Sequence, residues 1–183
     1  YSEQVRSGKI SFEEFMAMES CSARSQGSCM TMGTASTMAC VTEALGVQLP
    51  GAAAMPAVDS RKFALAHLSG RRIVKMVEED LKLSQILNRK SFENAIKILA
   101  AIGGSTNAVV HLLAIAGRAG VDLTLDDFDR IGSRIPLLVN LQPAGEHLME
   151  DLFRAGGLRA VLKEVEKHLD RSAINVTGKP VVE

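Results

Sequence analysis

The sequence predicts a mainly α-helical protein with a few short strands, and three observations support this. Apolar residues recur at helical spacing over most of the 183-residue chain. Capping residues stand ahead of several of these apolar stretches. Strand composition is confined to two short segments, residues 137–141 and 174–177. With 46% hydrophobic residues the chain can fill one core, so we expect a single domain or partial domain over residues 1–183.

The first half of the chain contains three predicted helices. Ser11 and Glu14 have the spacing of a capping box, so a short helix should begin there. The second helix has apolar and small residues at helical spacing and almost no charge, which predicts a central position, and Gly46 ends it. A connector rich in proline and glycine follows, and Asp59 then caps a long helix in which Gly70 is a candidate kink. We expect these helices over residues 11–19, 34–45 and 60–81, with a loop at 21–32.

The second half is predicted to contain five helices and both strands. Ser91 caps the first helix, and a Gly-Gly-Ser-Thr-Asn turn leads into an apolar helix that ends near Gly120. Thr124 and Asp127 form another capping box, and a glycine pair separates the last two helices. Prolines bound the better of the two strands. We expect helices over residues 92–101, about 108–120, from 124, 148–155 and 158–169, and strands over 137–141 and 174–177.

Composition excludes several classes of partner and compartment. Lys plus Arg and Asp plus Glu balance at 21 each, and aromatic residues make up 4% with no Trp, so neither a basic surface for nucleic acid nor a base-stacking platform is expected. No apolar run reaches the roughly 18–20 residues of a membrane span, and no signal pattern opens the chain. Three cysteines without a Cys-x-x-Cys pair indicate a reducing compartment, so we expect a cytoplasmic protein.

Cys29 is the candidate reactive residue. It lies in a loop directly ahead of the helix predicted from residue 34, where backbone N–H groups and the helix dipole favour a thiolate. A thiolate can attack electrophiles or bind metal, whereas the alternative from local sequence is a buried structural cysteine. Cys21 and Cys40 stand at spacings that match no usual zinc or ferredoxin pattern, and Cys40 is expected in the core.

The turn at residues 103–107 is a second candidate. Free N–H groups at a helix start could hold a carboxylate or a phosphate. The turn lacks the Lys of a P-loop and the spacing of a dinucleotide-binding fingerprint. The alternative is a plain helix cap in which two glycines permit close packing.

Several motifs give the chain a resemblance that covers nearly its whole length in order. The motifs are Gly-Ser-Cys-Met-Thr-Met-Gly-Thr-Ala-Ser-Thr-Met at 27–38, Glu-Ala-Leu-Gly at 43–46, Leu-Pro-Gly at 49–51, Ala-Ile-Gly-Gly-Ser-Thr-Asn-Ala-Val at 101–109, Leu-Thr-Leu-Asp-Asp-Phe at 123–128, Met-Glu-Asp-Leu at 149–152, Ala-Gly-Gly-Leu at 155–158 and Val-Thr-Gly-Lys at 176–179. With these motifs the chain resembles the family of dihydroxy-acid and sugar-acid dehydratases, which are iron–sulfur enzymes.

The resemblance implies a fragment of the α/β N-terminal domain of such a dehydratase, namely the later part of that domain, with the C-terminal domain absent. It implies a hydro-lyase that removes water from a 2,3-dihydroxy acid to give a 2-keto acid. A [2Fe–2S] or [4Fe–4S] cluster held by three cysteines and a Mg²⁺ ion are its implied cofactors. Cys29 matches the third cluster cysteine, while the other ligands and the serine base are expected outside this chain. A homodimer or dimer of dimers is implied as well.

Substrate choice is read from the residues after Cys29. Gly33 stands where branched-chain dihydroxy-acid dehydratases usually carry an aromatic residue. In this the chain resembles dehydratases of sugar acids such as arabonate. The resemblance places Thr31 and Gly33 near the substrate. The favoured product is therefore a 2-keto-3-deoxy acid, and the alternative is the dehydratase of branched-chain amino-acid biosynthesis. An alternative of another class is a non-catalytic helical packing or interface module, suggested by the apolar helices at 35–45 and 108–116.

Overall fold

The computed structural model describes residues 1–22 and 29–182 and shows a helical protein, as expected. Within these residues the backbone forms isolated β-bridges and no extended ladder. Part of the loop predicted at 21–32 lies outside the described residues. The helices are α1 (Ser2–Arg6), α2 (Phe12–Ser22), α3 (Thr34–Ala44), α4 (Ser60–Glu78), α5 (Leu83–Ile86), α6 (Arg89–Ala101), α7 (Asn107–Ala119), α8 (Leu125–Gly132), α9 (Met149–Arg154), α10 (Gly157–Glu164) and a 3-10 turn, Glu166–His168.

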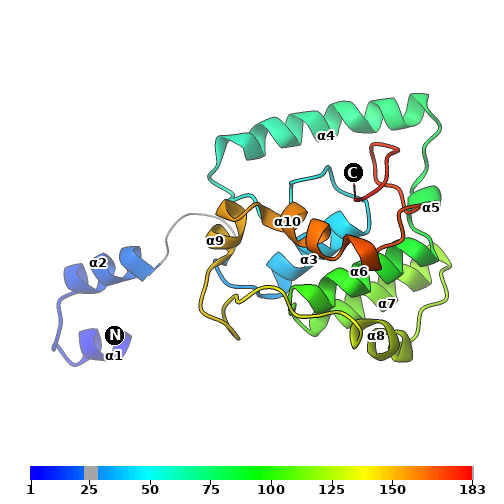
Figure 1. Ribbon diagram of the computed structural model, residues 1–183. Coiled ribbons are helices and arrows are strands. Elements are labelled where there is room, and N and C mark those ends of the chain that lie inside the picture. Colours follow the sequence, from blue (N-terminus) through cyan, green and yellow to red (C-terminus); the bar gives the residue numbers. More distant parts are fainter. Residues whose placement is uncertain (23–28, 183) are drawn as a thin grey trace.

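Helix α3 lies at the centre of the fold, which confirms the position predicted from its low charge. It packs against α6 and α7, while α9 and α10 lie beside its other flank (Figure 1). Cys40 and Val41 on α3 are fully buried, and they belong to two different core clusters. The helix therefore separates the two halves of the core and contacts both.

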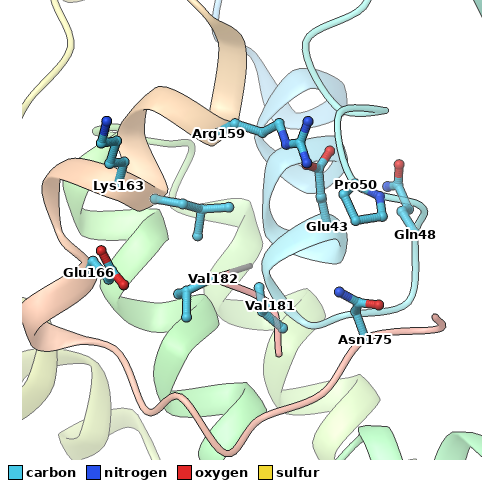
Figure 2. A pocket seen from close by; sticks show the side chains of 10 residues that line it. Glu43, Gln48, Pro50, Arg159, Lys163, Glu166, Asn175, Val181 and Val182 are labelled. Carbon is cyan, nitrogen blue, oxygen red and sulfur yellow. The ribbon is translucent and has the colours of Figure 1, made fainter. Parts of the chain in front are cut away.

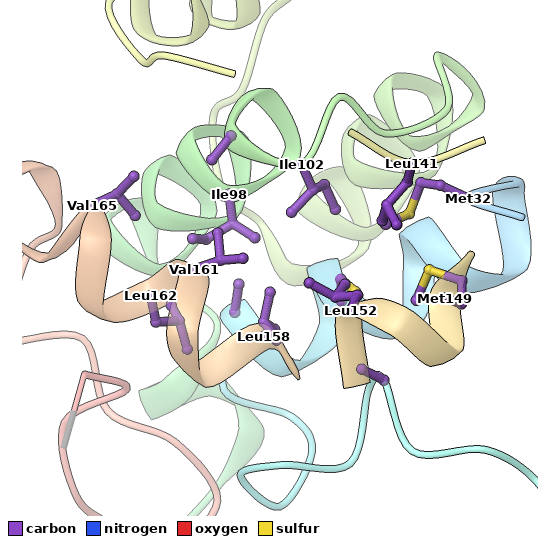
Figure 3. Close-up of a cluster of buried hydrophobic side chains, with 14 of the residues drawn as sticks. Met32, Ile98, Ile102, Leu141, Met149, Leu152, Leu158, Val161, Leu162 and Val165 are labelled. Atoms are coloured by element: carbon purple, nitrogen blue, oxygen red, sulfur yellow. The ribbon is translucent and has the colours of Figure 1, made fainter. Parts of the chain in front are cut away.

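The first half of the core is formed mainly by α3, α6, α9 and α10, whose side chains point toward one another in Figure 3. The second half lies between α3, α6 and α7 and is centred on Phe92 and Leu112, which are fully buried. Gly46 follows α3 with φ +87°, and a Cβ there would lie 2.5 Å from the carbonyl oxygen of Ile174. Only glycine fits this close approach between α3 and the C-terminal segment.

Two predicted capping boxes are confirmed and one predicted cap is wrong. The backbone N–H of Ser11 donates to the Glu14 carboxylate over 2.7 Å, and the box of Thr124 with Asp127 is also formed. The cap of helix α6 is Asn88, three residues before the expected cap Ser91, because the Asn88 side chain accepts from the N–H of Ser91 and Ser91 Oγ accepts from the N–H of Asn88. Ser91 is therefore the third residue of the helix and the reciprocal half of the box.

Both predicted strands are wrong. The segment 137–141 makes a single bridge, between Leu141 and His147, and the segment 174–177 makes a single bridge, between Ile174 and Pro180. Both segments have strand-like composition, but neither has a neighbouring strand among the described residues, and a strand needs a partner to satisfy its backbone groups. The last predicted helix is also shorter than expected, since α10 ends at Glu164.

Helix α4 runs along one side of the body (Figure 1), and several of its apolar side chains are exposed. Its Asp59 cap is confirmed, because the Asp59 side chain accepts from the N–H of Arg61 over 2.9 Å. Gly70 causes no break, and the helix continues through it. The side chain of Met76 is buried, whereas Phe63 and Val77 are 78% and 76% exposed. No described helix has the length and apolar character needed to cross a membrane.

Helices α1 and α2 pack on each other and lie apart from the other helices in Figure 1. Phe12 on α2 stacks against Phe15 with ring centroids 6.2 Å apart, yet Phe12 is 66% exposed. The body that carries the candidate site therefore consists of α3 to α10.

Candidate functional site

Cys29 lies at the surface of the body, immediately before helix α3. Among the described residues Cys29 is therefore not part of a core, which was the alternative that local sequence left open. Its Sγ lies 3.1 Å from Thr31 Oγ1, and hydrogen bonds from the hydroxyl and the backbone N–H of Thr31 lower the pKa of the thiol. A lowered pKa favours the thiolate, which is the form that binds metal.

Backbone hydrogen bonds from a distant segment fix the loop that carries Cys29. The N–H of Met149 donates to the carbonyl of Met30, and the N–H of Met32 donates to the carbonyl of Gln142, both over 2.7 Å. We call residues 29–33 with these two bonds the clamped loop. Because the clamp holds both sides of residue 31, it fixes the loop that leads from Cys29 to the start of α3 at Thr34.

A small pocket of about 110 Å³ opens beside Cys29. Its walls come from the clamped loop, the first turns of α3 and α9, the 53–57 connector and α4. Most of the wall is alanine and methionine, and the ammonium of Lys62, which donates to the carbonyl of Ala52 over 3.0 Å, lies at its edge. The exposed thiol therefore lines a cavity whose walls come from segments that are far apart in the sequence.

The 103–107 turn meets the start of α3 through hydroxyl and amide groups. Thr34 Oγ1 lies 3.2 Å from Ser105 Oγ and accepts from the Asn107 side chain over 2.8 Å. The N–H of Ser105 donates to Thr37 Oγ1 over 2.9 Å. Gly104 packs so closely on α3 that a Cβ there would lie 2.6 Å from Thr37 Cγ2. Gly104 therefore permits close packing of the turn on α3, and the N-termini of α3 and α7 lie side by side.

The residues present offer one metal-binding thiolate rather than a complete metal site. Cys40 is fully buried, as expected, and burial raises the pKa of its thiol to about 12, so it remains protonated. Among the described residues, no three His, Cys, Asp or Glu side chains gather as a metal site. The side chain of Cys21 lies outside the described part. An iron–sulfur cluster fits Cys29 as one ligand and requires others from outside the described residues.

A larger cavity, of about 290 Å³, lies elsewhere and shares no lining residue with the pocket at Cys29 (Figure 2). Glu43 of α3 lies at its base, and Arg159 of α10 points toward Glu43. The carboxylate of Glu43 accepts from the N–H groups of Gly51 and Ala53, each over 2.7 Å, while burial raises its pKa. These bonds hold the segment that contains Gly51 and Ala53 against α3. The buried carboxylate of Glu43 therefore has a structural role.

The structure brings together the residues that sequence singled out after Cys29. Thr31 contacts the thiol directly, and an added Cβ at Gly33 would meet nothing within 4 Å, so a side chain has room there. The sequence did not indicate the role of Gln142 and Met149 in holding this loop. Both act through backbone hydrogen bonds, which do not depend on the type of side chain.

Comparison with known proteins gives matches over the whole chain. Residues 1–183 match the family described as Dihydroxy-acid/6-phosphogluconate dehydratase N-terminal. The chain is 58% identical over 181 residues to a Rhizobium meliloti (strain 1021) protein named "Putative dehydratase IlvD1", covering 99% of this chain and 32% of that protein.

Two further relatives carry different substrate names. The chain is 55% identical to an L-arabinonate dehydratase of Rhizobium leguminosarum bv. trifolii (strain WSM2304), over 99% of this chain and 32% of that protein. It is 47% identical to a dihydroxy-acid dehydratase of Methanothermobacter thermautotrophicus, over 98% of this chain and 33% of that protein. The chain therefore spans about a third of the length of the curated relatives it matches.

Proposed function

Because the chain belongs to the dihydroxy-acid/6-phosphogluconate dehydratase N-terminal family, we propose that the whole protein is a hydro-lyase acting on a 2,3-dihydroxy acid. Such an enzyme removes the C2 proton and the C3 hydroxyl as water, and the enol product becomes a 2-keto acid. The observation that supports this most directly is Cys29, an exposed thiol with a lowered pKa on a clamped loop beside a pocket. A catalytic base and the remaining ligands belong to parts of the protein outside the described residues.

We assign Cys29 as the ligand that this chain supplies to an iron–sulfur cluster of the [2Fe–2S] or [4Fe–4S] type. When bound, the cluster supplies a Lewis acid for the departing hydroxyl, and Mg²⁺ positions the substrate. The chain's own contribution is to present a thiolate at a fixed place. The hydrogen bonds from Thr31 favour that thiolate, and the bonds from Met149 and Gln142 hold the loop against α3 and α9.

We propose a sugar acid as the substrate, with a 2-keto-3-deoxy acid as the product. Support comes from the identity to the L-arabinonate dehydratase, 55% against 47% for the archaeal dihydroxy-acid dehydratase, and from the open space at Gly33. The branched-chain dihydroxy acid is the second candidate, because several relatives named dihydroxy-acid dehydratase are 46–50% identical. A bulky residue at position 33 would narrow the space in which a polyhydroxylated chain lies.

Gly33→Phe in the full-length enzyme tests this substrate assignment. The variant should lose more kcat/KM with arabonate than with dihydroxyisovalerate, because the ring removes room next to the cluster cysteine. Gly117→Phe is the control, since Gly117 also has open space around it but lies on α7. Equal losses with both substrates would show that Gly33 is required by the backbone and has no part in substrate choice.

Cys29→Ser in the full-length enzyme tests the cluster assignment. A serine hydroxyl is a poor ligand for iron compared with a thiolate, so most of the bound iron and the activity should be lost. Iron and acid-labile sulfide per chain are measured after anaerobic purification, together with far-UV circular dichroism to establish the fold. Full cluster content in a folded Cys29→Ser protein would refute the assignment.

An interface role is the second candidate function of this part of the chain. Of the two helices first considered for it, at 35–45 and 108–116, α3 is a poor basis because it is covered on most sides, whereas α7 exposes Val110. The exposed apolar surface lies instead on α4, where Ile73, Val74 and Val77 are 55–76% exposed. We propose that α4 is covered in the complete cytoplasmic protein, a homodimer or dimer of dimers. Protection of its amides from hydrogen exchange in the full-length protein would support that.

A further inference from the structure

The side chain of Thr31 is hydrogen-bonded to the thiol of Cys29. The distance between Thr31 Oγ1 and Cys29 Sγ is 3.1 Å, within the range of hydrogen bonds to sulfur. A thiolate has no proton to give, so the hydroxyl is the donor whenever Cys29 is deprotonated.

The backbone around Thr31 holds this hydroxyl in place. The carbonyl of Thr31 accepts from the N–H of Gly33 over 2.8 Å and from Ser36 Oγ over 3.2 Å. The neighbouring residues on both sides are fixed by the bonds of the clamped loop to Gln142 and Met149. Because the main chain on either side is fixed, the donor needs no rearrangement to reach the sulfur.

We propose that Thr31 is a positioning residue that donates a hydrogen bond to the Cys29 sulfur in the holoenzyme and thereby sets the reduction potential and the air sensitivity of its cluster. The inference rests on the proposed function, which makes Cys29 a ligand. Hydrogen bonds to ligand sulfurs withdraw electron density and stabilise the reduced cluster, which is the more negative form. Loss of this bond therefore makes the cluster easier to oxidise.

The test compares three full-length holoenzymes with the wild type: Thr31→Val, Thr31→Ser and Thr42→Val. Valine keeps the shape of threonine and lacks the hydroxyl, whereas serine keeps the donor. Thr42→Val is the matched control, because the Thr42 hydroxyl donates to the Met38 carbonyl within α3. Iron and sulfide per chain, the midpoint potential and the rate at which cluster absorbance bleaches in air are measured for each.

Thr31→Val should move the midpoint potential in the negative direction by about 59 mV for one electron, equivalent to an about tenfold change in the ratio of oxidised to reduced cluster. It should also bleach several-fold faster in air. Thr31→Ser and Thr42→Val should match the wild type. A potential in Thr31→Val equal to that of the wild type would overturn the proposal, and so would the same shift in Thr31→Ser.

The two proposals fail in different ways. Thr31→Val could bind too little cluster for its potential to be titrated. In that case a wild-type potential in Thr31→Ser still supports the hydroxyl as the group that acts on the cluster. A Thr31→Ser protein without cluster overturns the role of the hydroxyl. If Cys29→Ser retains a full cluster, the ligand assignment itself fails. A normal loss of iron in Cys29→Ser combined with an unchanged potential in Thr31→Val removes the role of Thr31 alone.

Discussion

Gly104→Ala tests the contact that joins the 103–107 turn to helix α3. Gly104 has an ordinary backbone conformation, so alanine meets no strain in φ there. Its added methyl would lie 2.6 Å from Thr37 Cγ2 and 2.7 Å from Leu99 Cδ1, distances that real methyl groups do not adopt. Thr37 is fully buried and β-branched, so it cannot turn away, and the turn itself must move.

Overpacking of this kind costs roughly 1–3 kcal/mol in the free energy of unfolding. With two side chains overlapped we expect about 2 kcal/mol, which lowers the midpoint of thermal unfolding by about 4–8 °C for a chain of this size. Urea unfolding followed by far-UV circular dichroism measures the loss. Gly132→Ala is the matched control, because its methyl would lie an ordinary 3.7 Å from the Ala100 Cβ and alanine favours the helix.

A second substitution tests the cause of the loss. Thr37→Ser removes Cγ2 and keeps the oxygen that accepts from the N–H of Ser105. Combined with Gly104→Ala it should recover part of the lost stability, so the double variant should be more stable than the sum of the two single losses predicts, by at least about 0.5 kcal/mol. Additive losses, or a Gly104→Ala protein as stable as the wild type, would refute the reasoning from close packing.

The remaining predictions concern a buried thiol, a carboxylate and the chain itself. Cys40→Ala should cost about 1–2 kcal/mol in the free energy of unfolding through lost packing and leave iron content unchanged; loss of iron with an intact fold would make Cys40 a ligand. The guanidinium of Arg89 holds the pKa of Asp127 well below its usual range. The ionised Asp127 therefore stabilises the folded protein fully above about pH 4, and this stabilisation is lost as the pH falls further. Urea unfolding midpoints measured from pH 6 to pH 2.5 should fall more steeply in the wild type than in Asp127→Asn. The 183-residue chain alone should bind no stoichiometric cluster after anaerobic reconstitution and form no keto acid, because it offers one matching thiolate; stoichiometric iron and turnover would contradict this.

The helices could be predicted from sequence because their signals are local. The box of Ser11 with Glu14 and the left-handed glycine at 120 each lie within a few residues of the end they mark. Asn88 was missed as the N-cap because serine is itself a preferred N-cap residue. Only the structure shows that the side chains of Asn88 and Ser91 each accept a hydrogen bond from the backbone of the other. The failure at residues 137–141 has a different cause, since composition predicts an extended conformation but cannot supply the neighbouring strand.

The position of Cys29 in a loop ahead of α3 was predictable from sequence, and its surroundings were not. The loop position and the motif around it identify the thiol, and the short spacing to Thr31 brings the two side chains together. The partners that fix the loop, Gln142 and Met149, act through main-chain atoms more than 100 positions away. Long-range backbone pairing of this kind follows from the packing of α9 on the core, which no local pattern encodes.

The clamped loop has a consequence for the order in which the protein is completed. Synthesis proceeds from the N-terminus, so Cys29 is made 120 residues before Met149, whose N–H closes the clamp. At roughly 5–20 residues per second this interval is about 6–24 s. During that time the nascent chain carries the thiol on a segment that has not yet acquired its long-range bonds. Cys29 therefore cannot take up its clamped position until Met149 has been made, and the newborn thiol is most open to oxidation in those seconds.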